Sequence, residues 1–276
     1  MNIVQITDAN QLMTLEENKF IGELPNLTKS QINFIGKNNI LICEEGVHLR
    51  DSRINFNIDN SILYLSGSIH DYSINISLHE NNVCFIGKNN FFDGRATFVL
   101  SEAKNIILGD NCFISYNVIF RTSDDYCMYK IGSKNCLNHA KSIYVGDHVF
   151  FDQNSMILKG SVIGSGAIIG AGTVVSNKSI RSNTMSVGIP LRTINENTFW
   201  TSNLNHGNGE YGIQEISKSN HDLFVYDVNE DTLDLDTVEA NLNDFSDLED
   251  VVDYLVFTFL LAGKNRFASN RDIYMF

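Results

Sequence analysis

Large apolar residues recur at every sixth position along one stretch of this chain, and this spacing limits the folds it can adopt. From residue 145 the sequence divides into the hexapeptides VGDHVF, FDQNSM, ILKGSV, IGSGAI, IGAGTV and VSNKSI. The first position is always large and apolar: Val145, Phe151, Ile157, Ile163, Ile169 and Val175. The fifth is small or β-branched: Val149, Ser155, Ser161, Ala167, Thr173 and Ser179. An amphipathic helix would need spacings of three and four, so the pattern predicts a solenoid of short strands.

Packing explains why these two positions are restricted. Three hexapeptides give a coil of about eighteen residues with three short, flat strands. The first-position side chain points into the prism and stacks on its equivalent in the next coil, while the fifth shares the same narrow interior. Gly, Asn and Asp between them supply the corners, where a positive φ costs little. Each coil then buries its core only against its neighbours.

The same register continues upstream through first-position residues Ile86, Phe92, Phe98, Leu108, Ile114 and Phe120. The string FIGKNN occurs at residues 34–39 and again at 85–90, and this separation of 51 residues predicts about three coils between the copies. The runs Ser61–Leu65 and Ile74–Leu78 are rich in β-formers and predict two further strands.

One interruption breaks the register. After Phe120 the next first position is due at residue 126, but the pattern resumes only at Val145. About nineteen residues are therefore inserted between Arg121 and Lys141. Insertions at the corners of a solenoid commonly carry function.

Charge and cysteine content restrict the partners and the compartment. Of the net charge of −13, twelve acidic residues lie in 221–253, which holds no Lys or Arg, so no basic footprint for nucleic acid is present. The cysteines form no CxxC pair and indicate reduced thiols: Cys43, Cys84, Cys112, Cys127 and Cys136. We expect no signal peptide at Met1–Asn10, and Val251–Ala262 is too short to span a bilayer. A cytoplasmic location is expected.

Four segments carry a family resemblance: 106–124, 140–151, 157–176 and 186–200. They resemble the hexapeptide-repeat acyltransferases, most closely the sugar and capsule polysaccharide O-acetyltransferase type. The resemblance implies an all-β fold, a left-handed parallel β-helix, in place of the usual right-handed crossovers. It further implies a homotrimer with acetyl-CoA in the groove between neighbouring prisms.

The chain is expected to divide into an N-terminal segment (1–29), a β-helix domain (30–200) with an inserted loop (121–142), and an acidic C-terminal extension (201–276). We expect the extension to be mixed α/β, and its first twenty residues, rich in Asn, Ser and Gly, to form a linker.

Within the extension, Leu223–Val228 predicts a strand. Ser246–Glu249 fits a capping box that opens a helix ending at Gly263. Beyond Asp253 this helix is apolar on nearly all sides, so it should pack against the prism or a partner chain. The acidic run 230–250 is expected to be a solvated face.

The resemblance implies a histidine base in the inserted loop, in a motif resembling S-D-x-H-x-I. Here the loop reads SDDYCM from residue 123, so Tyr126 occupies the histidine position and is expected to contact the substrate instead. Tyrosine, with a reference pKa of about 10, is a poor base. His139, in the same loop, is the predicted base; alternatively it only packs or caps the loop. His148 is a weaker candidate, because family members with a histidine there do not use it as base.

The remaining predicted site residues also come from the resemblance. The backbones of Ala171 and Ser176 would receive the pantetheine arm of acetyl-CoA. Lys178 and Arg192 would meet its phosphates or else lie on a solvated surface. Phe150 stands where many members carry tryptophan, which keeps an aromatic wall but loses an indole N–H. Arg95 would bind a sugar acid or hydroxyl, or make a plain surface or trimer contact.

The sequence therefore predicts an O-acetyltransferase that moves acetyl from acetyl-CoA to a sugar hydroxyl of a bacterial capsule or other surface polysaccharide. N-acetylation of an amino sugar and a non-catalytic CoA- or glycan-binding scaffold remain alternatives. A γ-type carbonic anhydrase would need two closely spaced metal-binding histidines, whereas the nearest pairs here lie nine residues apart. We expect no metal.

Overall fold

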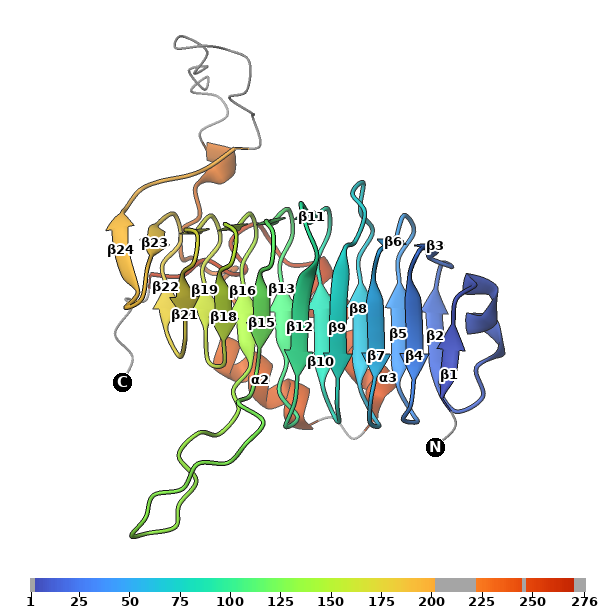
Figure 1. Cartoon of the computed structure of the whole chain (residues 1–276). Coiled ribbons are helices and arrows are strands. Elements are labelled where there is room, and N and C mark those ends of the chain that lie inside the picture. The colour runs from blue at the N-terminus through green and yellow to red at the C-terminus, as the bar shows by residue number, and fades with distance from the viewer. Residues whose placement is uncertain (1–2, 202–221, 245–246, 271–276) are drawn as a thin grey trace.

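The computed structural model describes residues 3–201, 222–244 and 247–270. Its strands stack into three long faces of a prism, which confirms the predicted parallel β-helix (Figure 1). The first face contains β1 (Val4–Ile6), β4 (Gln31–Phe34), β7 (Arg53–Phe56), β9 (Ile74–Leu78), β12 (Ala96–Leu100), β15 (Ile119–Arg121), β18 (Met156–Leu158) and β21 (Val174–Val175).

The second face contains β2 (Lys19–Gly22), β5 (Ile40–Cys43), β8 (Ile62–Leu65), β10 (Val83–Ile86), β13 (Ile106–Leu108), β16 (Ile143–Val145), β19 (Val162–Ile163) and β22 (Ser179–Ile180). The third contains β11 (Phe91–Phe92), β14 (Phe113–Ile114), β17 (Phe150–Phe151), β20 (Ile168–Ile169), β23 (Met185–Val187) and β24 (Arg192–Asn195). A separate two-stranded sheet is formed by β3 (Asn26–Thr28) and β6 (His48–Arg50), and the 3₁₀ helix η1 (Ala9–Thr14) lies near the N-terminus.

The interior follows the hexapeptide register. All first- and fifth-position residues from 145 to 179 are buried, and so are the upstream first positions. Phe98 stacks on Phe120 with ring centroids 4.7 Å apart, and Phe34 stacks on Phe56 at the same distance. Each such side chain contributes about 1.5–3 kcal/mol through burial. The predicted stacking is confirmed.

Coil length changes along the prism. After the inserted loop, Tyr144 pairs with Val162, a separation of 18 positions that matches the predicted coil. Upstream, Cys84 pairs with Ile106, a separation of 22 positions. Across the loop, Ile106 pairs with Ile143, a separation of 37 positions. This is a coil of 18 positions lengthened by the nineteen residues predicted for the insertion. Parallel pairing already begins at β2, which pairs with β5.

The longer upstream coils make one prediction wrong. Phe34 pairs with Phe56 and lies in the interior behind the first face, whereas Phe85 belongs to the second face and points outward. The two FIGKNN copies are therefore not three coils apart in the same position. The second copy lies two coils further along the prism and on the next face, because each upstream coil carries extra corner residues.

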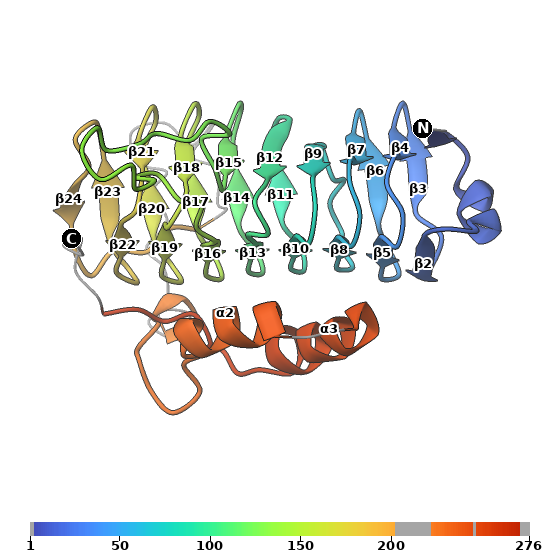
Figure 2. The same cartoon turned by 90° about the horizontal axis from the view of Figure 1, so that it is seen from below.

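The described part of the C-terminal extension is helical and covers the second face (Figure 2). It contains η3 (Asp222–Phe224), α2 (Leu235–Asp244), α3 (Leu248–Leu255) and the π-helical turn η4 (Val256–Leu260). Outward side chains of the second face pack against this layer, and the ring of Phe85 lies 5.1 Å from that of Phe259. None of the helices in the described ranges is long and apolar enough to cross a membrane.

Several predictions for the extension need correction. The predicted strand Leu223–Val228 is wrong: its start forms η3 and the rest is irregular. The helix near residue 248 is confirmed, but Asp247 caps it, accepting from Glu249 N, and the π-helical turn ends at Leu260 rather than Gly263. Ser246 lies outside the described residues, as does the linker after Thr201.

The acidic run is largely solvated, as expected, and part of it forms α2; within 230–244 and 247–250, Glu239 is the one carboxylate that is not exposed. Glu239 on α2 is half-buried: it bonds to Lys104 Nζ at 2.8 Å and accepts from the Tyr144 hydroxyl at 2.6 Å. The run thus supplies a specific contact between the helical layer and the coils, because these coils offer a cation and a phenol at the matching position.

Arg266 provides the most buried polar anchor between the helical layer and the coils. Its side chain is 4% exposed and bonds to Asp147 at 2.7 Å and to Asp110 at 2.8 Å. Burial raises the pKa of Asp147, and the guanidinium opposes that shift. Removing one partner from such a cluster leaves an uncompensated buried charge.

We predict that Arg266→Met lowers the free energy of unfolding by about 3–5 kcal/mol, measured by urea denaturation. Lys19→Met is the control, because Lys19 bridges to Glu249 of the same layer with both side chains about half exposed or more. It should cost about 0–1 kcal/mol. Equal losses in the two variants would contradict the anchor role of Arg266.

Candidate active site at the root of the inserted loop

The inserted loop leaves the prism after β15 and returns before β16 as a projecting hairpin (Figure 1). Met128 and Leu137, and Lys130 and Asn135, are joined by backbone hydrogen bonds across it. Large apolar side chains on the hairpin face solvent: Tyr126, Met128, Tyr129, Ile131 and Leu137. The hairpin is therefore ordered by its own backbone but buries little of its apolar surface within one chain.

The neck of the loop is closed by Asn138 and Lys159. Asn138 Nδ2 donates to Asp124 Oδ2 at 2.9 Å and to the Tyr126 carbonyl at 2.8 Å, while its Oδ1 accepts from Met128 N. Lys159, which follows β18 in the next coil, donates to Asp124 Oδ2 at 2.6 Å and to the Asn138 carbonyl at 2.8 Å. These hydrogen bonds, that from Lys159 first, lower the pKa of Asp124 below 3.8.

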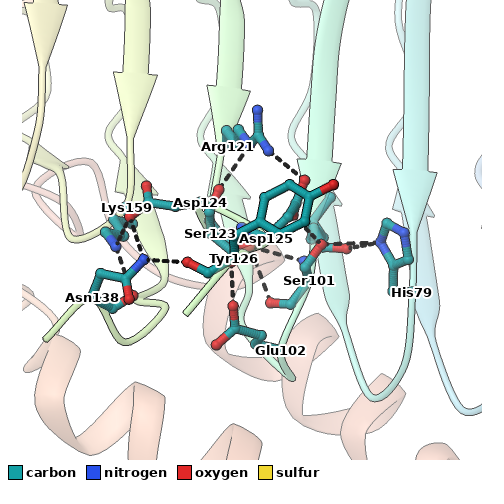
Figure 3. A network of polar contacts seen from close by, with 12 residues as sticks. His79, Ser101, Glu102, Arg121, Ser123, Asp124, Asp125, Tyr126, Asn138 and Lys159 are labelled. Carbon is teal, nitrogen blue, oxygen red and sulfur yellow. Dashed lines mark hydrogen bonds and ion pairs between the residues drawn. The ribbon is translucent and has the colours of Figure 1, made fainter. Parts of the chain in front are cut away.

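The polar network continues toward the N-terminal coils (Figure 3). Arg121 forms an ion pair with Asp125, and the Ser123 hydroxyl donates to Glu102. Ser101 Oγ lies 3.4 Å from Asp125 Oδ1 and 3.1 Å from His79 Nδ1.

His79, Ser101, Thr122 and Lys159 each follow a strand of the first face directly, as does Ser176 further along. We call these five residues the loop-side row. The row lies where the first face turns toward the second. It connects the start of the inserted loop, residues 121–125, to the coils on either side; we call this start the loop root. The row's hydroxyls, amine and imidazole lie on one edge of the prism, together with the carboxylates of Glu102, Asp124 and Asp125.

Four predicted site residues lie along this edge. Tyr126 and His139 sit on opposite sides of the neck, and both are exposed. Ser176 and Lys178 follow β21, one coil beyond Lys159. No hydrogen bond to the His139 side chain is formed within the described part of the chain. Its role as base stays a prediction.

The other four predicted site residues lie elsewhere. Phe150 is on β17 and Arg192 on β24, both in the third face. Arg95 and Ala171 lie at the corner between the third and first faces, and both are exposed. Within one chain, these four residues therefore lie apart from the four at the loop-side edge, because the first face separates the two groups.

The indole of Trp200 lies beside Phe150, a contact that the hexapeptide pattern does not predict. The ring of Trp200 lies 5.7 Å from that of Phe150, so the aromatic wall includes a tryptophan contributed from far downstream in the chain. Trp200 Nε1 donates to the His148 carbonyl at 2.8 Å, and the indole stacks on the His148 ring at 4.1 Å. The only signal in the sequence is that Trp200 is the single tryptophan.

His148 is enclosed by this contact. Its ring lies between Trp200 and Phe224, and Nε2 bonds to the Trp200 carbonyl at 3.0 Å. Burial lowers its pKa below 6.5, despite the hydrogen bonds that favour the charged form. A ring sandwiched in this way joins the corner between β16 and β17 to Trp200 and Phe224 and is poorly placed to meet a substrate.

His79 is the residue of the network that the hexapeptide pattern misses. It precedes Ser101 by one upstream coil, a separation of 22 positions, so the two side chains stand side by side. A search at this longer period would place them in register. Among the described residues, no group of three or more His, Cys, Asp or Glu is arranged to hold a metal.

Residues 142–177 match the family model described as bacterial transferase hexapeptide (six repeats). This stretch spans the hexapeptide coils from β16 to β21. The chain is 37% identical over 102 residues to a polysialic acid O-acetyltransferase of Escherichia coli O1:K1 / APEC, covering 37% of this chain and 33% of the relative. It is 32% identical over 113 residues to a polysialic acid O-acetyltransferase of Neisseria meningitidis, covering 41% of this chain and 53% of the relative. The matches thus span about a third and about half of these relatives' lengths.

Solved structures agree with this fold. The polySia specific acetyltransferase NeuO superposes with a TM-score of 0.61 at 27% identity, covering 69% of this chain and 88% of that one. The polysialic acid O-acetyltransferase OatWY superposes with a TM-score of 0.55 at 21% identity, covering 70% and 94%. At that identity the second likeness shows the fold alone.

We predict that Lys159→Met raises the pKa of Asp124 toward 3.8, because the hydrogen bond that lowers it most is lost. Since the folded-state pKa is depressed, the neck is stabilised above pH 3.8 and loosens as pH falls through the lower, folded value. The titration of the Asp124 carboxyl carbon followed by NMR measures this shift. Lys130→Met, on the hairpin away from the neck, should leave it unchanged; a wild-type midpoint at or above 3.8 would contradict the neck contacts.

Proposed function

We propose that this chain transfers acetyl from acetyl-CoA to a hydroxyl of a bacterial capsular polysaccharide, with polysialic acid as the first acceptor to test. The observation that carries the proposal is the conjunction of hexapeptide coils, a long corner insertion and relatives named polysialic acid O-acetyltransferases. The likeness to NeuO, at a TM-score of 0.61, supports the same activity.

Ester formation needs a base for the acceptor hydroxyl and donors for the oxyanion. The loop root offers both kinds of group on one edge, with the Lys159 amine and the His139 and His79 imidazoles along it. Acetyl-CoA would lie along Ser176 and Lys178 from one chain. Phe150, Ala171 and Arg192 would complete its site, and Tyr126 and Arg95 would contact the acceptor.

These residues lie on separate edges of one prism, so we propose that the site forms between neighbouring copies in a homotrimer. The second face is covered by α2 and α3, which leaves the first and third faces for subunit contacts. The first-face edge of one copy, with its loop root, would then meet the third face of the next. The use of acetyl-CoA supports a cytoplasmic location.

A second candidate function is a CoA- or glycan-binding scaffold without turnover. The observation that favours it is Tyr126 at the loop position where the family carries its histidine base. This tyrosine is 85% exposed and lies at the neck, where it could contact a ligand without accepting a proton.

The test is incubation of the purified chain with radiolabelled acetyl-CoA and a panel of capsular polysaccharides that includes polysialic acid. We predict label on a polymer that is released by mild alkali, because esters hydrolyse under conditions that amides survive. Heat-denatured chain is the control for spontaneous transfer. Alkali-stable label would indicate N-acetylation instead. Acetyl-CoA binding in calorimetry without label on any polymer would favour the scaffold.

A further inference from the structure

His79 is held so that one ring nitrogen is left free as a proton acceptor. Its Nδ1 lies 2.7 Å from the Leu100 carbonyl oxygen and 3.1 Å from Ser101 Oγ. A carbonyl oxygen can only accept, so Nδ1 carries the proton and Nε2 of the neutral ring carries the lone pair. Nε2 has no hydrogen-bond partner within the described ranges, and the residue is half-buried.

The other four described histidines are held differently. His48 has both nitrogens engaged, Nδ1 with Asp71 at 2.7 Å and Nε2 with Thr28 at 2.8 Å. His148 is enclosed between two rings, and His70 packs edge-on against Phe91 on the third face. His139 is exposed, with no contact in the described structure that orients its ring.

A short relay links His79 to the loop root. Ser101 is buried, and its hydroxyl lies between His79 Nδ1 and Asp125 Oδ1, at 3.1 and 3.4 Å. The serine oxygen can accept from Nδ1–H while its own proton points to the carboxylate. Asp125 is held in turn by Arg121. The relay therefore ties the orientation of the His79 ring to the inserted loop.

We propose that His79 Nε2 is the base of acetyl transfer, in place of His139; this rests on the proposed function. The acceptor hydroxyl oxygen bonds to the acetyl carbonyl carbon, and its proton passes to Nε2. As the tetrahedral intermediate collapses, the carbon–sulfur bond breaks and the departing CoA thiolate takes the proton from Nε2. The products are an acetyl ester and the CoA thiol, with His79 neutral again. Ser101 and Asp125 position the ring.

The decisive variant is His79→Asn. The Asn amide nitrogen takes roughly the place of Nδ1, so the hydrogen bond to Leu100 can persist while Nε2 is removed. We expect kcat for transfer to fall about 100-fold or more, with an unchanged melting temperature. His48→Asn is the matched control, because His48 lies on β6 outside the proposed site and its ring nitrogens are held by Asp71 and Thr28; it should leave kcat close to wild type. His139→Ala tests the competing imidazole on the other side of the loop neck.

Each outcome decides between the two imidazoles. Full activity in His79→Asn with loss in His139→Ala would overturn the proposal and make the loop histidine the base, leaving the proposed function standing. Absence of transfer by the wild-type chain would overturn both. A nitrogen–proton NMR correlation of the imidazole rings gives a readout that needs no substrate. It should show His79 protonated at Nδ1, and protonation at Nε2 in the neutral ring would overturn the assignment.

Discussion

The width of the prism interior is the constraint on which the rest of this molecule depends. Side chains from three strands share a space so narrow that the same positions must be filled in every coil. Phe98 and Phe120 stack with an interplanar angle of 6°, as do Phe34 and Phe56. An interior packed this way has no room for a ligand. Chemistry is therefore confined to corners and outer faces, and the repeat aligns corner residues from successive coils into rows.

The outer faces are not equivalent. The second face carries outward apolar residues such as Ile62, Phe85 and Ile107, which are covered by α2, α3 and η4. Arg266 fixes this cover through two aspartates of the coils. α2, α3 and η4 do not cover the first and third faces, which border the loop root and the aromatic wall of Phe150 and Trp200. The helical layer thus leaves the other two faces for the proposed subunit contacts and ligands.

Much of this could be predicted from periodicity. The hexapeptide register identified the interior residues and gave the length of the insertion, because stacking in a narrow interior allows little variation. Corners are under no such restriction: an asparagine with positive φ, as at Asn60 and Asn81, lets a corner lengthen without changing the core. A pattern of three hexapeptides per coil therefore does not detect the longer upstream coils. For the same reason it does not predict that His79 and Ser101 lie next to each other.

The extension was less predictable for a different reason. Its helix near residue 248 has a strong capping signal and an apolar stripe. α2 lies in an acidic segment that docks through contacts of Glu239 with Lys104 and Tyr144, far away in the sequence. The predicted strand at Leu223–Val228 had the composition of a strand but pairs with no strand of the described ranges. Trp200 likewise acquires its place beside Phe150 only through the folded coils.

A crystal structure of the chain with bound coenzyme A tests the central claim most directly, because it locates the reacting sulfur relative to the loop-side row. The account predicts the pantetheine arm along the first-face edge, with the thiol directed toward the loop root and an imidazole within about 4 Å once the acceptor is present. Coenzyme A seated in the 200 Å³ cavity between Tyr144 and Phe267, beneath the helical layer and away from the loop, would contradict it.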